Sequence, residues 1–328
     1  MRRIKTAVVG VGALGKHHLR WMSQLPQSEL VGCYDTDMDK AAAHASEYNV
    51  RVFASLDELI GNVEAVSIVV PTSRHFAVAS QLIEAGIHCL IEKPITSDFT
   101  HAATLQELAD THNVKVTVGQ IERFNPAVLA LADEKIRPSF IEAHRLAAFD
   151  PRGTDVAVVL DLMIHDIDLV LKFVKSKIVD IQASAVAVIS ERADIANARL
   201  TFANGAVANL TASRISLHAM RKLRIFQTSG YYSLDLATKQ ADLYSMATDD
   251  GPSEGMRVPL GKSGRDILYR KKGDTGQDML GAELASFLDA VIHDRPVAVT
   301  VAEASEALRL ALEIDRIGIS SIARMMEA

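Results

Sequence analysis

The sequence predicts an α/β fold in two domains, and three observations lead to this prediction. The chain has 328 residues, which is about the length of two domains. Its first 120 residues alternate short apolar runs with helical patterns, which is typical of a doubly wound parallel sheet covered on both faces. After residue 120 the strand candidates lengthen and a hairpin signal appears. We therefore expect a doubly wound domain over residues 1–120, and an α/β domain with a large, mostly antiparallel open sheet over residues 121–328.

Strand and helix candidates alternate through the first 120 residues. The strand candidates are IKTAVVG, ELVGCYD, RVFA, AVSIVV, IHCLIE and VKVTVG. The helix candidates lie near residues 15–25, 37–48, 75–85 and 98–112. SLDE at residues 55–58 has the spacing of a capping box and predicts one more short helix. Gly86 marks the end of the helix in HFAVASQLIEAG.

The second half of the chain mixes helices with longer strands. Helices are expected over residues 125–135, 158–174, 277–293 and 302–325. In NARLTFANGAVANLTASRIS, Asn204-Gly205 separates two β-prone runs and predicts a hairpin. Further strand-like runs lie near residues 221–236 and 240–246. TDDGPSEG and the basic segment GKSGRDILYRKKGD are expected to be loops.

Composition narrows the class of protein. The chain is 48% hydrophobic and 23% charged, which is ordinary for a protein with a sizeable core. Its net charge of −6 argues against nucleic acid or an anionic membrane as the main partner. No apolar run approaches the roughly 18 residues of a membrane span, and the N-terminus lacks the features of a signal peptide. Cys33 and Cys89 lie inside apolar runs and are expected to be buried thiols, so we expect a cytoplasmic protein.

A glycine-rich turn joins the first strand to the first helix. In AVVGVGALG, Gly10, Gly12 and Gly15 have GxGxxG spacing, which suits a tight turn, a closely approaching pyrophosphate and close helix packing. Asp35 ends the second strand, where a carboxylate can accept a hydrogen bond from an adenosine ribose. Acids follow Asp35 and would repel a 2′-phosphate, so NAD is favoured over NADP. The alternative is a purely structural turn. The cofactor-binding candidates here are Gly10, Gly12, Ala13, Leu14, Gly15 and Asp35.

Two further strands end in polar residues, at the sheet edge where ligands bind in doubly wound folds. CLIEKPI places a lysine before a proline, which favours an extended backbone and aims Lys93 off the sheet edge. PTSRH, residues 71–75, ends the preceding strand in the same way. The alternatives are a solvated lysine and a histidine that caps its helix. The candidates at this edge are Pro71, Thr72, His75, Glu92 and Lys93.

DLMIHDIDLVLKF, residues 161–173, places ionisable side chains on an apolar helix. At about 100° per residue, Asp161, His165 and Asp168 fall on one narrow stripe, and Asp166 stands apart. Because burial of unpaired charge is costly, the stripe is expected to face something polar. One alternative is a zinc site, although the helix supplies few imidazole or thiolate ligands. The other is a structural helix whose polar groups are all hydrogen-bonded.

GVGALG, PTSRH, EKP and the Asp-x-x-x-His of DLMIH, taken together, resemble the Gfo/Idh/MocA family over essentially the whole chain. The resemblance implies an N-terminal Rossmann domain that holds a nicotinamide cofactor. It implies a C-terminal domain whose open sheet supports oligomers and forms a wall of the substrate site. Lys93, Asp161 and His165 are then the catalytic residues. The chain departs from the family in AVVL before Asp161 and in Met163, where many members carry glycines, and this leaves the shape of the substrate pocket open.

The chemistry that this resemblance implies is hydride transfer from a carbinol carbon to nicotinamide. An imidazole, with an ordinary pKa of about 6.5, suits the general base at neutral pH, which assigns this role to His165. Asp161 would orient the imidazole or bind the substrate. Lys93 would stabilise the developing alkoxide, or would share in the proton relay if burial lowers its pKa. The polar stripe would then face the nicotinamide across the domain cleft.

Several residues after the last strand of the first domain are candidates for substrate binding. GQIERFNPAVLAL carries Arg123 and Asn125, and Arg214 ends a hairpin strand. The planar fork of arginine suits a diphosphate or a carboxylate, although structural ion pairs are the alternative. With Asp168, these residues form the expected substrate-binding set. IERFNPAV and LDLMIHDIDLVL resemble most the family members that oxidise the 3-hydroxyl of UDP-N-acetylglucosamine, with free-sugar or inositol dehydrogenases as the runner-up.

An alternative outside the enzymes is an NAD-binding sensor without turnover. Such a protein is expected to lose part of the catalytic trio, which is complete in this chain. ARLTFANGAVANLTAS keeps apolar residues on both sides of its strands, which predicts that the second sheet face is buried against another copy. We therefore expect a homodimer or homotetramer formed through the C-terminal sheet. The other expected partner is a sugar or nucleotide-sugar substrate, and no metal is expected.

Overall fold

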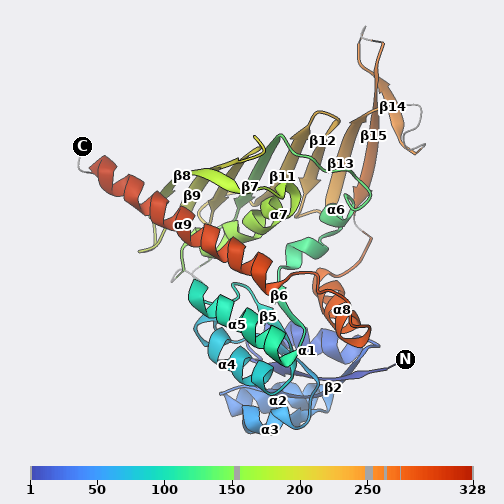
Figure 1. The fold of residues 1–328 in the computed structure, drawn as a ribbon, viewed down its shortest axis with the longest axis vertical. Coiled ribbons are helices and arrows are strands. Elements are labelled where there is room, and N and C mark those ends of the chain that lie inside the picture. The colour runs from blue at the N-terminus through green and yellow to red at the C-terminus, as the bar shows by residue number, and fades with distance from the viewer. Residues whose placement is uncertain (1, 151–155, 248–253, 262–263, 274, 327–328) are drawn as a thin grey trace. The chain divides into compact units, whose positions relative to one another are not determined.

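The structure is a computed structural model that describes residues 2–150, 156–247, 254–261, 264–273 and 275–326 (Figure 1). The chain divides into two compact units. The first contains Met1–Ile121 and Asp278–Leu308, and the second contains Glu122–Gln277 and Arg309–Ala328. The first break lies next to the expected boundary after residue 120. The segment 278–308 was expected in the second domain, but it belongs to the first unit.

The first unit is a doubly wound fold. Its six parallel strands have the order β3-β2-β1-β4-β5-β6, so the order reverses between β1 and β4. The strands are β1 (Ile4–Val9), β2 (Ser28–Tyr34), β3 (Arg51–Val52), β4 (Ala65–Ile68), β5 (His88–Glu92) and β6 (Val116–Gly119). The helices are α1 (Gly15–Gln24), α2 (Met38–Tyr48), α3 (Leu56–Ile60), α4 (Thr72–Glu84), α5 (Phe99–His112) and α8 (Met279–Ile292), followed by the start of α9 (Val301–Met326). Ligands of such sheets bind at the carboxyl ends of the strands beside this reversal.

Helix α8 joins the first unit because its apolar side packs against α1. Leu284, Phe287 and Leu288 belong to the same buried cluster as Leu19 and Met22 of α1. Gly281 brings the two helices close together, since a Cβ at this position would lie 2.8 Å from the Trp21 ring. Sequence periodicity predicted this helix, but it carried no information about which sheet the helix covers.

Local signals in the first unit are confirmed. The backbone N–H of Glu58 donates to Ser55 Oγ at 3.1 Å, as the capping box predicts. Gly86 adopts a φ of +78° just after α4, a conformation that favours glycine. Cys33 and Cys89 are free and buried, and burial together with the nearby Asp35 raises the pKa of Cys33 to about 11.

The second unit is built on a nine-stranded sheet of order β14-β15-β13-β12-β11-β7-β10-β9-β8. Its neighbouring strands pair antiparallel, except that β7 and β10 are parallel. The strands are β7 (Phe140–Leu146), β8 (Ile178–Val186), β9 (Ile195–Phe202), β10 (Val207–Ser213), β11 (Met220–Gln227), β12 (Gly230–Asp235), β13 (Gln240–Met246), β14 (Met256–Pro259) and β15 (Asp266–Gly273). Its helical segments are α6 (Pro126–Leu129), the π-helix η2 (Val159–Met163), α7 (Ile164–Val174) and the rest of α9. The 3₁₀-helix η1 (Ile121–Phe124) begins at the break between the units.

The second unit differs from expectation in several elements. The helix expected over 125–135 is only the four-residue α6, and the run 221–236 folds as two strands, β11 and β12. β15 lies in the basic segment that was expected to be a loop, while most of TDDGPSEG lies outside the described residues. β7 and β8 were not expected. The buried face of β7 carries Ile141, Ala143 and Arg145, and this arginine hides the alternation of a half-buried strand.

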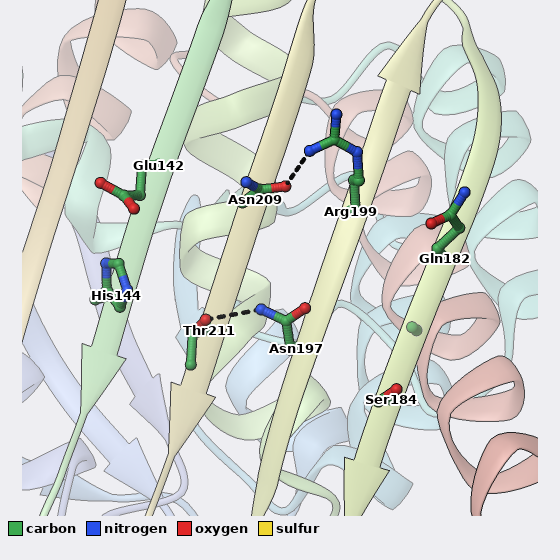
Figure 2. Close-up of a pocket in the computed structure, with 9 residues that line it drawn as sticks. Glu142, His144, Gln182, Ser184, Asn197, Arg199, Asn209 and Thr211 are labelled. Carbon is green, nitrogen blue, oxygen red and sulfur yellow. Dashed lines mark hydrogen bonds between the residues drawn. The ribbon is translucent and has the colours of Figure 1, made fainter.

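The two faces of the nine-stranded sheet are distinct. α7 packs on one face, against β7 and β10, with Ala198, Leu200 and Leu210 among the residues buried on that side (Figure 1). The opposite face, called the outer face below, carries polar side chains on β7, β8, β9 and β10. Figure 2 shows eight of them, namely Glu142, His144, Gln182, Ser184, Asn197, Arg199, Asn209 and Thr211, around a hollow of about 430 Å³. The expectation of apolar residues on both sides of β9 and β10 is therefore wrong.

The outer face becomes aromatic on the other side of β7. Neighbouring rings follow one another from strand to strand, with centroids 4.8–5.6 Å apart. The rings are those of Phe140, Phe226, Tyr231, Tyr244 and Tyr269, on β7, β11, β12, β13 and β15. None of the helices in the described ranges is both long and apolar enough to cross a bilayer.

Candidate active site

The three glycines of the first turn have separate tasks in the structure. Gly10 has a φ of +89°, and a Cβ there would lie 2.5 Å from the carbonyl oxygen of Val69. A Cβ at Gly15 would lie 2.0 Å from the carbonyl oxygen of Gly10. Gly12 is different, because nothing lies within 4 Å of the place where its Cβ would be. The fold therefore needs glycine at positions 10 and 15, whereas Gly12 leaves open space that a closely approaching pyrophosphate can occupy.

Two helices at this sheet edge begin without a side-chain cap. The cap residues are Leu14 for α1 and Pro71 for α4, and neither side chain accepts a hydrogen bond from the first N–H groups of its helix. In the same unit α2, α3 and α5 are capped by Asp37, Ser55 and Asp98. Ala13 and Leu14 are exposed, and α1 has no acidic residue in its first turn. Uncapped N–H groups and the helix dipole favour an anion, so the turn fits the diphosphate of a dinucleotide.

Asp35 lies at the carboxyl end of β2 and contacts the same turn. Its Oδ2 accepts from the Val11 N–H at 2.8 Å, and its Oδ1 accepts from the Asp37 N–H at 2.9 Å. Each carboxylate oxygen has a second lone pair, so Asp35 can still accept from a ribose hydroxyl. This placement agrees with the role expected for Asp35, and the backbone contacts also fix its orientation.

The turn of Lys93 follows β5 and contains a cis peptide bond between Lys93 and Pro94. His75 is buried beneath it, with Nδ1 2.9 Å from the carbonyl oxygen of Pro94 and Nε2 2.9 Å from that of Val70. Both ring nitrogens of His75 therefore meet the backbone. This favours a supporting role for His75, and contact with cofactor or substrate stays a prediction.

Glu92 lies directly before Lys93 and points back into the unit. Its Oε2 accepts from the Lys93 N–H at 3.2 Å, and its Oε1 lies 3.2 Å from Nε2 of the buried His18. His18 is a residue that sequence reasoning missed. Its contacts, Ser67 and Glu92, come from β4 and β5, so no local pattern marks it.

In the second unit, Asp161 lies in the π-helix η2, and His165 lies at the start of α7. Both side chains are partly exposed. The expected stripe assumed a regular α-helix through all these residues. The Ile164 N–H instead donates to the carbonyl oxygen of Val159, which closes a π turn between the two candidates. Such turns often occur at functional sites.

The other two aspartates of this segment are buried and paired with arginines. Arg123 holds Asp168 through two bonds, Nε to Oδ2 at 2.8 Å and Nη2 to Oδ1 at 2.7 Å. Arg145 holds Asp166 in the same way, at 3.1 and 2.8 Å, and also donates to Glu122 at 2.8 Å. Asp168 is therefore buried against Arg123, whereas the other two members of the expected stripe, Asp161 and His165, are partly exposed. Sequence reasoning missed Arg145 and Asp166 because their pairing depends on the unexpected strand β7.

Burial raises the pKa of Asp166, and the bonded Arg145 opposes this rise because it favours the carboxylate. Burial by itself lowers the pKa of Arg145, but Asp166 and Glu122 outweigh burial and raise it, so the guanidinium stays protonated. A charged pair with both carboxylate oxygens bonded fixes α7 against η1 and β7. Arg123 and Asp168 therefore have a structural role, and contact with a substrate stays a prediction for them.

Asn125 and Arg214 are also buried. Asn125 caps α6, since its Oδ1 accepts from the Ala127 N–H, and its Nδ2 donates to Glu122 and to the Leu236 carbonyl. Arg214 donates to the carbonyl oxygen of Val156, just before η2, and its Nε lies 3.9 Å from Asp194. These contacts stabilise the segments around the site.

Asp194 is a further residue that sequence reasoning missed. Its carboxylate accepts from the backbone N–H groups of Val188, Ile189 and Ser190 at 2.7–3.0 Å. Burial by itself raises the pKa of Asp194, but these bonds outweigh burial and lower it well below its usual range. The neighbouring Ala193 carbonyl accepts from the Val158 N–H at 2.9 Å, so this loop also supports the start of η2.

The structure does not favour the zinc alternative, because Asp168, its third ligand, is already bonded. Both oxygens of Asp168 are bonded to Arg123. Within the described ranges, no group of three or more His, Cys, Asp or Glu side chains could hold a metal ion.

Comparison with known proteins identifies the family of both units. Residues 4–120 match the Gfo/Idh/MocA oxidoreductase model, described as an NAD-binding Rossmann fold, and residues 140–233 match the Gfo/Idh/MocA C-terminal domain. The chain is 38% identical over 316 residues to the UDP-N-acetylglucosamine 3-dehydrogenase of Acidithiobacillus ferrooxidans, covering 96% of this chain and 97% of that protein. It is 27% identical to a myo-inositol dehydrogenase of Streptomyces leeuwenhoekii, covering 94% and 96%.

Solved structures agree with the sequence matches. The Acidithiobacillus ferrooxidans enzyme matches with a TM-score of 0.88 and 37% identity, over 97% of this chain and 98% of that one. A scyllo-inositol dehydrogenase of Lactobacillus casei, solved with NAD(H) and scyllo-inositol, matches in fold with a TM-score of 0.78 and 20% identity, over 98% of each chain. The expected fold class, family and NAD-dependent oxidoreductase activity are confirmed, because this chain belongs to the Gfo/Idh/MocA family of NAD-binding oxidoreductases.

Proposed function

We propose that this protein oxidises the 3-hydroxyl of UDP-N-acetylglucosamine to a ketone with NAD⁺ as the oxidant. The observation that carries the proposal is the 38% identity, over 96% of the chain, to a relative of that activity. The complete set of Lys93, Asp161 and His165 supports turnover rather than binding alone.

The residues at the carboxyl edge of the first sheet are proposed to hold NAD. Gly12 and the uncapped N-terminus of α1 suit the diphosphate, and Asp35 suits the adenosine ribose. The N-terminus of α4, with Pro71 and Thr72, and the turn of Glu92 and Lys93 lie at the ends of the adjacent strands β4 and β5. When bound, NAD⁺ supplies the hydride acceptor.

His165 is proposed as the general base that takes the proton of the sugar hydroxyl. Asp161 hydrogen-bonds either this imidazole or the sugar. Lys93 stabilises the negative charge that develops on the oxygen as the C–H bond breaks. The buried residues Arg123, Asn125, Asp168 and Arg214 support η1, η2 and α7, and their contact with the substrate stays a prediction.

The test is NADH formation with a panel of UDP-sugars, free hexoses and inositols, with a trapping amine or a coupled aminotransferase to draw off the ketone. Turnover confined to UDP-N-acetylglucosamine supports the proposal. Turnover on free hexoses or inositols would replace it with the runner-up, which the full-length match to a myo-inositol dehydrogenase favours. NAD binding without turnover on any member of the panel would favour the sensor.

The catalytic assignments need a test that joins residues of both units. Lys93→Met and His165→Asn are each expected to lower kcat roughly 10²–10⁴-fold while NAD binding is retained. Residues that serve one reaction give non-additive losses, so the double variant is expected to lose much less than the product of the two. Near-normal turnover in either single variant would contradict the assignment.

We further propose a homodimer or homotetramer formed through the outer face. Support comes from the row of aromatic rings and the polar hollow of Figure 2, which lie on the face of the large sheet opposite α7. Sedimentation at micromolar concentration tests this proposal, and a monomer there would contradict it.

We propose that the protein works in the reducing cytoplasm, which its two buried free thiols fit.

A further inference from the structure

His18 is a fully buried histidine beneath the turn that carries Lys93. It lies on α1, within the first unit, and none of its surface is exposed. Its Nδ1 lies 2.7 Å from Oγ of Ser67 on β4, and its Nε2 lies 3.2 Å from Oε1 of Glu92 on β5. Any buried histidine needs polar partners for its ring nitrogens, and the partner of Nε2 here is the residue directly before Lys93.

The partners of His18 define its tautomer. Glu92, as a carboxylate, offers only acceptors, so Nε2 must carry the proton that faces it. Nδ1 then accepts from the Ser67 hydroxyl. The chain of contacts runs from Ser67 through His18 to Glu92, with one proton available for each contact.

Glu92 links this chain to Lys93. While Oε1 faces His18, Oε2 accepts from the backbone N–H of Lys93 at 3.2 Å. Gly119 of β6 makes room for the carboxylate, because a Cβ there would lie 2.9 Å from Oε1. Glu92 is thus held on one side by the glycine of the next strand and on the other by His18.

The contact between His18 and Glu92 is not a well-aligned hydrogen bond, although Nε2 is fully buried and 3.2 Å from Oε1. Contacts of this kind around active sites often tighten when substrate binds. The hydrogen bond between a buried N–H and a carboxylate becomes much stronger when the N–H points at the oxygen, because little water competes for either group.

We propose that His18 is a positioning residue for Lys93, which it orients through the carboxylate of Glu92. The inference rests on the proposed function, because it assumes that Lys93 acts in catalysis. His18 touches neither substrate nor cofactor in this account. It fixes the rotamer of Glu92, and Glu92 fixes the backbone from which the Lys93 side chain departs.

Two substitutions of His18 separate positioning from packing. The amide nitrogen of Gln reaches about as far as Nε2 of histidine, whereas that of Asn reaches only as far as Nδ1. His18→Gln can therefore still donate to Glu92, and His18→Asn cannot. We expect kcat to fall roughly tenfold or more in His18→Asn and to recover most of this loss in His18→Gln, with KM for NAD⁺ within about twofold in both.

A double-variant cycle tests whether His18 acts through Glu92. If it does, His18→Asn combined with Glu92→Gln is expected to have nearly the kcat of Glu92→Gln alone. If the kcat losses of the two single variants multiply in the double variant, His18 does not act through Glu92. His88→Asn is the control, because His88 is a partly buried histidine of the same unit that accepts a hydrogen bond from the Lys115 N–H, but it lies at the opposite end of β5 from Glu92.

A measurement without turnover separates this inference from the proposed function. The rate at which an amine reagent labels Lys93, followed by mass spectrometry, reports the environment of the lysine whatever the substrate is. We expect His18→Asn to change this rate severalfold, and His18→Gln and His88→Asn to leave it nearly unchanged. An unchanged rate and kcat in His18→Asn, with only a lower melting temperature, would overturn the inference and leave His18 a packing residue.

Discussion

The segments that carry the candidate catalytic residues are held in two different ways. In the first unit, the turn of Lys93 is held by contacts of histidines with backbone carbonyls and with one carboxylate. In the second unit, η2 and α7 are held by buried arginines, each bonded to both oxygens of an aspartate. Loss of one partner of a buried ion pair leaves a charge without compensation, whereas Glu92 keeps its hydrogen bond from the Lys93 N–H when His18 is replaced. We therefore expect substitutions in the second segment mainly to lower the free energy of unfolding. Substitutions in the first segment are expected mainly to lower kcat.

The largest effect is expected at Arg145. Arg145→Met leaves Asp166 and Glu122 buried without their cation, and we expect a loss of about 3–5 kcal/mol in the free energy of unfolding. Urea unfolding followed by circular dichroism measures it. Arg2→Met is the control, because its pair with Glu64 is exposed and is expected to contribute about 0.2–1 kcal/mol. Equal losses in both variants would remove the distinction between the segments.

Asp194 adds a pH dependence to the second segment. Its folded-state pKa is lowered by three backbone N–H groups, so its stabilisation is present above the ordinary carboxyl pKa of about 4 and is lost as the pH falls further. Asp194→Asn is expected to lower the free energy of unfolding by about 2–3 kcal/mol at pH 7. Below pH 4 the difference in stability between this variant and the unmodified protein is expected to become smaller. Melting temperatures at pH 7 and pH 3.5 test this. The exposed Asp180→Asn serves as the control, and a gap independent of pH would contradict the account.

The glycine turn sharpens the comparison within the first unit. Gly12→Val places its side chain in open space, so we expect the free energy of unfolding to change by less than about 0.5 kcal/mol. The same side chain occupies the space proposed for the diphosphate, so we expect NAD to bind at least tenfold more weakly. Gly15→Val is the matched variant, and its clash with the Gly10 carbonyl is expected to destabilise the fold itself. Calorimetric titration with NAD and thermal melting separate the two effects. Unchanged NAD affinity in Gly12→Val would exclude the diphosphate from this space.

The smallest effect is expected at the uncapped start of α1. Leu14→Asp supplies an acceptor and a negative charge, which stabilise a helix N-terminus by about 0.3–1 kcal/mol. The same charge repels a diphosphate, so we expect a higher melting temperature without NAD and weaker NAD binding. Leu14→Asn is the control, because it adds an acceptor without the charge. If Leu14→Asp binds NAD as well as the unmodified protein, the diphosphate does not lie at this helix.

Most of the first unit could be predicted from the sequence because its signals are local. A glycine turn, a capping box and strands that end in polar residues each lie within a few neighbouring positions. Parallel strands bring such ends to one edge, which is why Asp35, Glu92 and Lys93 could be proposed together. His18 could not, because its role depends on contacts with two other strands.

The second unit was harder to predict because its polar groups pair over long distances. Arg123 and Asp168 are 45 residues apart, and Arg145 lies on a strand whose buried arginine hides its alternation. The alternation of β9 and β10 was present in the sequence, but alanines on the buried face weakened its contrast with the outer face. The partners that make Asp166 and Asp168 stable inside the unit therefore became visible only in the fold.

The π turn at η2 makes the length of this segment matter as much as its composition. A π turn holds one residue more than the α turn that could replace it. Removing Leu162 or Met163 would allow a continuous α-helix and would leave Asp161 three residues from His165 instead of four, so the angle between these two side chains about the helix axis would change. Variants of the same length can keep the two side chains in place through many exchanges of residue, whereas a one-residue deletion cannot. Insertions and deletions, rather than substitutions, are therefore the changes that this segment is least able to accommodate.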